Sequence, residues 1–227
     1  MQNIAPLLRR TAIALLAAAA FALPLACAAP PAFAQQKTQQ QTKTLSATDL
    51  ETVARVEQYL NSFATFEARF EQTGARGAIV RGALYIQRPG RLRVTYDPPI
   101  KSFMVATPVY LIYYDGELGE PTYLPLNSTP AGILVQKDIK LSGKLRVADV
   151  WRENDLLHVM IVEPGGNDKI NITLAFRQEP MQLKEWTVVD AQGFPTRVVL
   201  TDAKVNRPID QKHFDFVNPK PIPNAPK

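Results

Sequence analysis

Hydrophobic and polar residues alternate with a period of two over much of this chain. The clearest run covers residues 170–177, where every second position from Ile170 to Phe176 is apolar. This period places apolar side chains on one face of a strand and polar side chains on the other. Turn sequences such as Pro89-Gly90 and Asp115-Gly116 separate the runs at short intervals, which favours antiparallel neighbours. Further strands are predicted at residues 78–88, 91–97, 101–106, 109–114, 144–150, 156–163, 183–189 and 195–204.

The first segment with a helical pattern precedes the strands. Apolar residues from Leu50 to Phe63 recur at helical spacing, and Ser46 or Thr48 can serve as the N-cap, so we expect a helix at residues 47–63. We interpret the sequence Phe-Glu-Ala-Arg-Phe-Glu-Gln-Thr that begins at Phe66 as a helix end before an extended run.

A short helix interrupts the strands near the middle of the chain. Pro130 can occupy a first helical turn ahead of Ile133 and Leu134, which predicts a helix within residues 128–139. A curved sheet with one leading and one inserted helix buries its apolar face when the helices lie across the concave side. We therefore expect a mainly β protein with some α-helix, folded as a half-open antiparallel β-barrel.

Residues 1–34 have the organisation of a secretory signal peptide. Arg9 and Arg10 precede an apolar run, and Ala32-Phe33-Ala34 offers small residues where signal peptidase cleaves. A retained membrane anchor is the first alternative, because the apolar run is long enough to span a bilayer, although its prolines count against it. Lipidation of Cys27 is the second alternative, although the residues before it match the lipobox poorly. We expect cleavage after Ala34 and export to the periplasm.

Cleavage after Ala34 changes both charge and chemistry. It leaves 193 of the 227 residues and lowers the formal net charge from +5 to +3, too little to indicate a nucleic-acid partner. It also removes Cys27, the only cysteine, which excludes a disulfide, a thiolate metal site and a catalytic thiol. The expected organisation is a flexible polar linker at residues 35–45, one domain at 46–218 and a proline-rich tail at 219–227.

The sequence lacks the motifs that would indicate an enzyme. It has two histidines, His158 and His213, and none of the usual hydrolase, zinc-protease, phosphate-loop or dinucleotide motifs. Acidic residues such as Asp97, Asp115 and Asp149 lie at turns or strand ends, where solvated carboxylates are the default. A hydrolase would need carboxylates from distant strands to converge. We expect no enzyme activity, no cofactor and no bound metal.

Several motifs resemble those of the LolA family, the periplasmic outer-membrane lipoprotein carrier proteins. The resemblance runs from Phe66 to about Pro219, and its most specific parts are the aromatic pattern of residues 66–72 and the Gly-x-Leu-aromatic-aliphatic-x-Arg-Pro pattern of residues 82–89. The chain departs from the family at Thr107-Pro108-Val109, where Asp-Gly-Lys is usual, and at Val94, where an aromatic residue is common. Weaker matches are Tyr113-Tyr114-Asp115, Thr129-Pro130 and Phe214-Asp215-Phe216.

The resemblance implies a function and its partners. Family members have an incomplete barrel closed by helices that act as a lid over a hydrophobic cavity. They carry acylated lipoproteins from an ATP-driven, ABC-type extractor in the inner membrane to an outer-membrane acceptor, without doing chemistry on them. We expect the same of this chain, as a monomer. Two alternatives stay open: a periplasmic sensor of lipids or lipoproteins on the same scaffold, and a carrier of another amphiphile.

Strand alternation and the resemblance together select candidate site residues. Arg88 ends one strand, and the resemblance implies that it latches the lid helices closed through hydrogen bonds. Without the resemblance, the sequence favours a solvated arginine beside a turn. The alternation groups apolar side chains into one face, which is either plain core or a soft pocket for acyl chains. The candidate cavity residues are Phe70, Leu84, Ile86, Leu92, Val94, Tyr96, Met104, Ile133 and Leu134.

Overall fold

The computed structural model describes residues 44–143, 145–163 and 171–219. The expected signal peptide at 1–34, most of the linker expected at 35–45 and the tail beyond Pro219 lie outside the described residues, so those expectations stay predictions.

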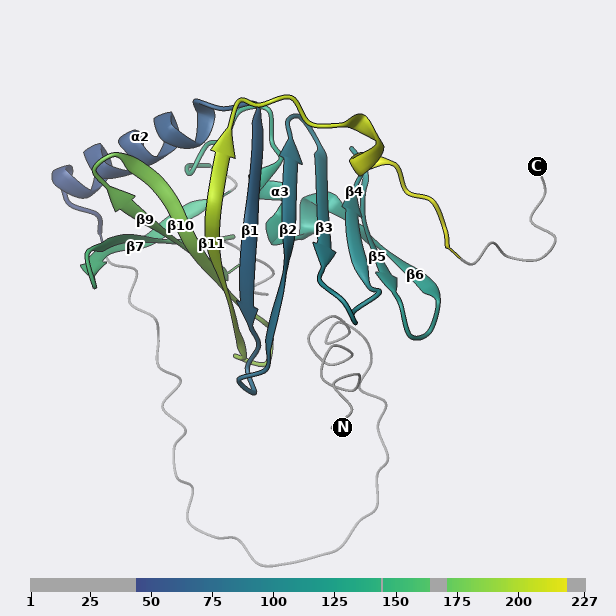
Figure 1. Cartoon of the computed structure of the whole chain (residues 1–227). Coiled ribbons are helices and arrows are strands. Elements are labelled where there is room, and N and C mark those ends of the chain that lie inside the picture. The colour runs from purple at the N-terminus through teal and green to yellow at the C-terminus, as the bar shows by residue number, and fades with distance from the viewer. Residues whose placement is uncertain (1–43, 144, 164–170, 220–227) are drawn as a thin grey trace, which may run out of the picture.

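The described strands form a single antiparallel sheet of eleven strands in the order β6-β5-β4-β3-β2-β1-β11-β10-β9-β8-β7. Figure 1 shows how this sheet curves without closing, with β6 and β7 at its two edges. The expected half-open antiparallel barrel is confirmed. The strands are β1 (Thr65–Thr73), β2 (Ile79–Gln87), β3 (Arg91–Tyr96), β4 (Phe103–Ala106), β5 (Tyr110–Asp115), β6 (Glu120–Pro125), β7 (Arg146–Glu153), β8 (Leu156–Val162), β9 (Asn171–Gln178), β10 (Met181–Val189) and β11 (Pro195–Val205).

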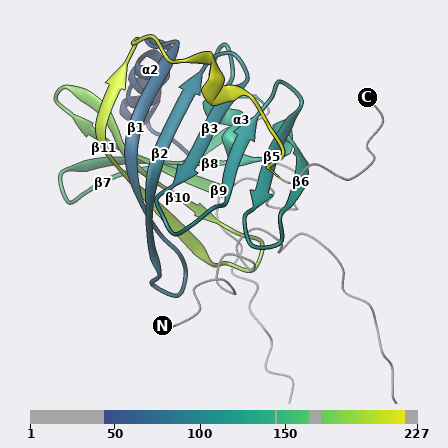
Figure 2. The same ribbon diagram turned by 45° about the vertical axis from the view of Figure 1, so that its right-hand side comes forward.

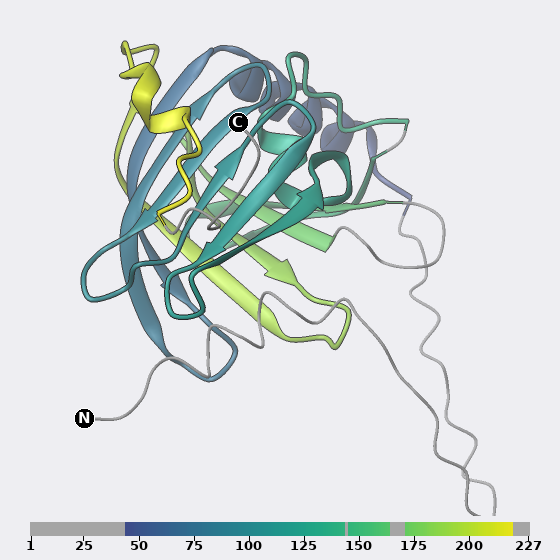
Figure 3. The same cartoon turned by 90° about the vertical axis from the view of Figure 1, so that its right-hand side faces the viewer.

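Two α-helices lie on the concave side of the sheet. Helix α2 spans Ala47–Asn61, and Ser46 caps it in a reciprocal capping box with Asp49. Helix α3 spans Pro130–Leu134, with Pro130 in its first turn and Thr129 as its N-cap. Figure 3 shows both helices inside the curve of the sheet. Short 3₁₀ turns, η1 (Leu126–Ser128) and η2 (Gln211–Phe214), complete the described elements.

Burial of one apolar cluster holds the sheet and helices together. Val56 and Leu60 of α2 and Ile133 of α3 pack against the concave faces of strands from both halves of the sheet, including Leu84 of β2 and Phe176 of β9. Each fully buried side chain of this size contributes about 1.5–3 kcal/mol to folding. The helices are therefore needed to cover the apolar face of the sheet.

Two strands differ from the sequence-based expectation. Residues 66–73 are not a helix end: they belong to β1, which lies in the middle of the sheet between β2 and β11. Glu, Ala, Arg and Gln favour helices, but Phe66 and Phe70 alternate with charged residues at strand period, and tertiary packing outweighs local propensity. Strand β6 was not predicted. Its Pro121 and Pro125 are tolerated because β6 is an edge strand.

The C-terminal segment crosses the opposite, convex side of the sheet. His213 of η2 stacks on Tyr85 at 4.1 Å between ring centroids, and Phe216 packs against a separate small cluster that contains Phe103 and Tyr114. Figure 2 shows η2 and the following residues running over the outer side of the strands. The lid helices and the C-terminal segment thus occupy different faces.

Candidate functional site

The nine candidate cavity residues come together on the concave side. Leu84 of β2, Val94 of β3 and Met104 of β4 are direct partners across the three strands. The other residues of the set, apart from two on α3, lie on the same face of β1, β2 and β3, and all nine belong to the main apolar cluster or pack against it. Ile133 and Leu134 of α3 meet them from the lid side. Their role in binding acyl chains stays a prediction.

Arg88 lies at the end of β2 and reaches both helices. Its Nε donates a hydrogen bond of 2.8 Å to the carbonyl of Leu134 in α3. One terminal nitrogen donates to the carbonyl of Leu60, in the last turn of α2, and to that of Phe63 at 3.2 Å. The guanidinium also lies over the Phe63 ring, 4.5 Å from its centroid. One side chain therefore ties the end of α2, the end of α3 and the sheet to one another.

The chemistry of Arg88 suits this position. The last carbonyls of a helix have no partner within the helix and carry partial negative charge, so a cation there is favourable. A guanidinium can serve several carbonyls at once because its donors are held in a planar fork. Burial lowers the pKa of Arg88 to about 10, an effect that the nearby Tyr59 opposes. Arg88 is thus a charge that is partly desolvated, and it is held by carbonyls rather than by a carboxylate.

Sequence reasoning missed a set of polar contacts made by α2. The Tyr59 hydroxyl accepts a hydrogen bond of 3.0 Å from the N–H of Leu183 in β10, which attaches the helix to the other half of the sheet. Glu57 and Asn61, one helical turn apart, bond to the backbone at Leu141 and Ile139. Their spacing places them on one face of a helix, but the sequence holds no sign of partners roughly 80 residues away.

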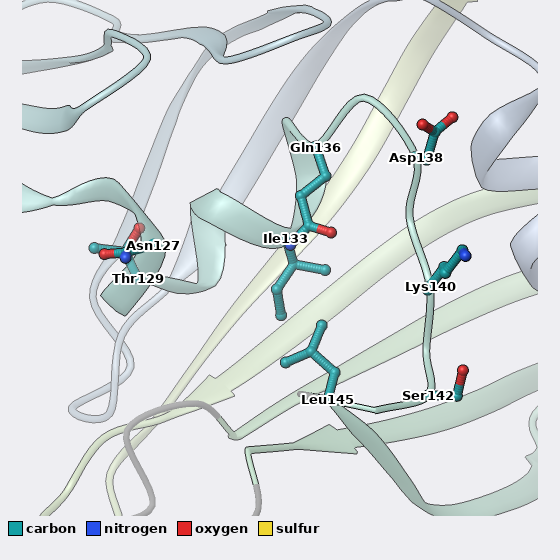
Figure 4. A pocket seen from close by; sticks show the side chains of 8 residues that line it. All are labelled: Asn127, Thr129, Ile133, Gln136, Asp138, Lys140, Ser142 and Leu145. Atoms are coloured by element: carbon teal, nitrogen blue, oxygen red, sulfur yellow. The ribbon is translucent and has the colours of Figure 1, made fainter.

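A pocket of about 250 Å³ opens beside α3. Figure 4 shows it between α3 and the chain that runs from Gln136 to Leu145. Ile133 and Leu145 supply the apolar part of its lining, and both also belong to the concave cluster. The polar residues that line it are Asn127, Thr129, Gln136, Asp138, Lys140 and Ser142.

A second polar group lies deep among the apolar side chains. The Tyr96 hydroxyl donates to Gln72 Oε1 at 3.3 Å, and the Tyr96 ring packs edge-on against Phe70 at 5.7 Å. Burial raises the pKa of Tyr96 far above its ordinary value, and Tyr113 adds to this effect. Tyr96 therefore stays neutral at any physiological pH and presents an uncharged hydroxyl to the interior.

Nothing in the described part of the chain suggests metal chemistry or a membrane span. No group of three or more His, Cys, Asp or Glu side chains there is placed to hold a metal ion. Across the same residues, no helix has the length and apolar character needed to cross a bilayer.

The fold and the site define a class of protein: a half-barrel whose concave apolar face is closed by helices that an arginine holds in place. Comparison with known families identifies the particular family, because residues 61–217 match the outer membrane lipoprotein carrier protein LolA. The chain belongs to the LolA family.

Curated relatives agree with this assignment. An outer-membrane lipoprotein carrier protein from Pseudomonas paraeruginosa is 26% identical over 184 residues, which cover 77% of this chain and 88% of the relative. A protein of the same name from Coxiella burnetii is 27% identical over 172 residues, covering 71% and 81% of the two chains. The crystal structure of a LolA superfamily protein from Nitrosomonas europaea matches with a TM-score of 0.44 at 9% identity, covering 76% of this chain and 99% of that chain.

Proposed function

We propose that this protein is a periplasmic carrier that encloses the acyl chains of lipoproteins within its curved sheet and shuttles them from the inner to the outer membrane. The observation that carries the proposal is the set of hydrogen bonds by which Arg88 joins α2 and α3 above the apolar interior. The family assignment and the names of the curated relatives support the nature of the cargo.

Magnitudes explain why such a carrier needs a lid. Each buried methylene contributes about 0.8 kcal/mol, so an acyl chain with about fourteen buried methylenes gains roughly 11 kcal/mol before any costs. A rigid open cavity would hold that cargo too tightly to release it. Opening the lid breaks buried hydrogen bonds at about 1–3 kcal/mol each, which lowers the net affinity. Affinity then falls into the range that permits transfer between partners.

The Arg88 contacts support a lid that favours release of the cargo. In the closed form the guanidinium caps the last turn of α2 and holds α3 by Leu134. Cargo that displaces the helices must break these bonds, and their recovery on closing favours release. An ABC-type extractor in the inner membrane would supply the acylated protein, and an outer-membrane acceptor would take it. The carrier would act as a monomer.

The test is native mass spectrometry with lipid extraction on residues 35–227 purified from the periplasm. We expect an acylated lipoprotein to co-purify, and Arg88→Leu to retain more of it than the wild type. Arg81→Leu is the matched control, because Arg81 lies on the same strand but is exposed and bonds Glu71 instead of the lid.

Two outcomes would contradict the carrier proposal. Empty protein in all three forms would point to a sensor that holds no cargo at rest. A bound lipid without any polypeptide would point to a carrier of another amphiphile.

A further inference from the structure

Residues 136–143, which follow α3, form a flap that is attached to α2. Asn61 bonds the flap twice: its Nδ2 donates to the Ile139 carbonyl at 2.9 Å, and its Oδ1 accepts from the Ile139 N–H at 2.9 Å. Glu57 Oε1 accepts from the Leu141 N–H at 2.6 Å. Two side chains of α2 thus pair with the flap backbone as a neighbouring strand would.

The flap separates the pocket from the apolar interior. Ile139 and Leu141 are 1% and 3% exposed and belong to the concave cluster. The polar side chains between and beside them, including Asp138 and Lys140, line the 250 Å³ pocket instead. Outward movement of the flap would withdraw two apolar side chains from the interior and join that interior to the pocket. An acyl chain could then pass beside Leu145.

Different elements hold the chain in place before and after Val135. Before this residue, α3 is held by the β2–β3 hairpin, through Arg88 and through the Gly90 N–H, which donates to the Val135 carbonyl at 2.8 Å. After it, within the described residues, the Gln136 N–H donates to the Ile133 carbonyl of α3 at 3.4 Å, and the other hydrogen bonds that join the flap to another element are those to Glu57 and Asn61. Outward movement of residues 137–143 would therefore break the bonds to Glu57 and Asn61 and leave the bonds that hold α3 intact.

We propose that Glu57 and Asn61 form a second latch, distinct from Arg88, which keeps the flap shut, and that the pocket beside the flap is the opening through which an acyl chain enters. This inference rests on the proposed function. The rim carries one carboxylate, Asp138, and one ammonium, Lys140, among uncharged polar groups. Such a rim suits the neutral ester and amide groups at the head of an acylated cysteine.

The two latches meet in the last turn of α2. Arg88 bonds the carbonyls of Leu60 and Phe63, which flank Asn61 in the sequence. Because both act on the same helix end, their effects on acyl exchange should not be additive. A double-mutant cycle with Arg88→Leu and Asn61→Ala measures this coupling.

The test follows the rate at which purified protein takes up fluorescent palmitate. Asn61→Ala and Glu57→Ala should each speed uptake by roughly tenfold, since the first loses two part-buried hydrogen bonds of the closed flap and the second loses one. Glu57→Gln keeps an acceptor oxygen for the Leu141 N–H and should restore a rate near that of the wild type. Gln58→Ala, at an exposed position of the same helix, is the matched control and should leave the rate unchanged.

A general loss of stability is tested separately. Phe214→Ala removes a buried side chain on the convex side and should lower the melting temperature without speeding uptake. If Phe214→Ala speeds uptake as much as Asn61→Ala does, or if Glu57→Gln behaves like Glu57→Ala, the second latch is wrong. Wild-type exchange rates in both alanine variants would also overturn it, while leaving the carrier function intact. Failure of the wild type to bind palmitate at all would instead contradict the carrier function.

Discussion

Replacing Arg88 with leucine should open the lid more than it unfolds the protein. Leucine fills part of the same space but leaves the carbonyls of Leu60, Phe63 and Leu134 without their donor. A hydrogen bond to a charged group contributes about 1.5–3 kcal/mol. Part of this loss is offset, because a charge no longer has to be desolvated. We expect the closed lid to lose about 3 kcal/mol, which corresponds to roughly a hundredfold rise in the open fraction.

Amide hydrogen exchange measures this directly. Exchange in the last turn of α2 and in α3 should accelerate in Arg88→Leu, whereas exchange in the β9–β10 pair, which Arg88 does not touch, should stay near the wild-type rate. Arg88→Lys should fall between the two, because a lysine ammonium lacks the planar fork that reaches carbonyls in different helices. Fluorescent palmitate should also leave the leucine variant more slowly, because closing no longer helps to expel it.

Two results would refute this reasoning. Uniform acceleration of exchange across helices and strands would mean that Arg88 supports global stability and not the lid. An unchanged open fraction in Arg88→Leu would mean that apolar packing of α2 and α3 alone keeps the lid closed.

Two further predictions concern the apolar interior. Burial raises the pKa of Tyr96 above the ordinary tyrosine value of 10.0, so above that pH the unfolded chain loses a proton that the folded chain keeps, and the free energy of unfolding should fall as pH rises. In Tyr96→Phe, urea unfolding between about pH 9 and 11, which brackets the ordinary tyrosine pKa, should show a smaller fall. The same fall in the variant as in the wild type would contradict this prediction. A Cβ at Gly82 would meet the Thr95 carbonyl and lie 2.6 Å from Phe70 Cζ, so Gly82→Ala should lower the free energy of unfolding by about 3 kcal/mol, as measured in urea. Gly74→Ala is the control, because the new Cβ there has open space around it. Equal losses of stability in both variants would show that the contact at Gly82 is unimportant.

Most of the strands could be predicted because period-two alternation is a local property. Strands β2, β3, β8 and β11 fall within a residue or two of their expected bounds. Strand β1 was misassigned because its charged residues also favour helices, and only its position between β2 and β11 decides the matter. Helix α2 was expected from its apolar residues at helical spacing and from its N-cap candidates, and it ends two residues before the expected end.

Less of the candidate site than of the fold could be predicted from the sequence. Alternation correctly placed Leu84 and Ile86 on one face of β2, and Leu92 and Val94 on one face of β3, since side chains two residues apart on a strand share a face. The resemblance singled out Arg88, although the residues around it in the sequence do not predict which carbonyls it bonds. Glu57 and Asn61 were missed, because their helical spacing shows only that both side chains lie on one face of the helix. It does not show which groups that face contacts.

The sequence by itself determined the period of each segment, the identity of the apolar face and the chemistry of each side chain, because these depend on neighbours a few residues apart. Tertiary structure decided how the sheet curves, which residues lie opposite one another and which backbone groups Arg88, Glu57 and Asn61 bond. Those features join segments far apart in the sequence: Glu57 and Leu141 are 84 residues apart, and Tyr59 and Leu183 are 124 residues apart. Their geometry follows from the packing of the whole sheet against α2 and α3, which no local pattern encodes.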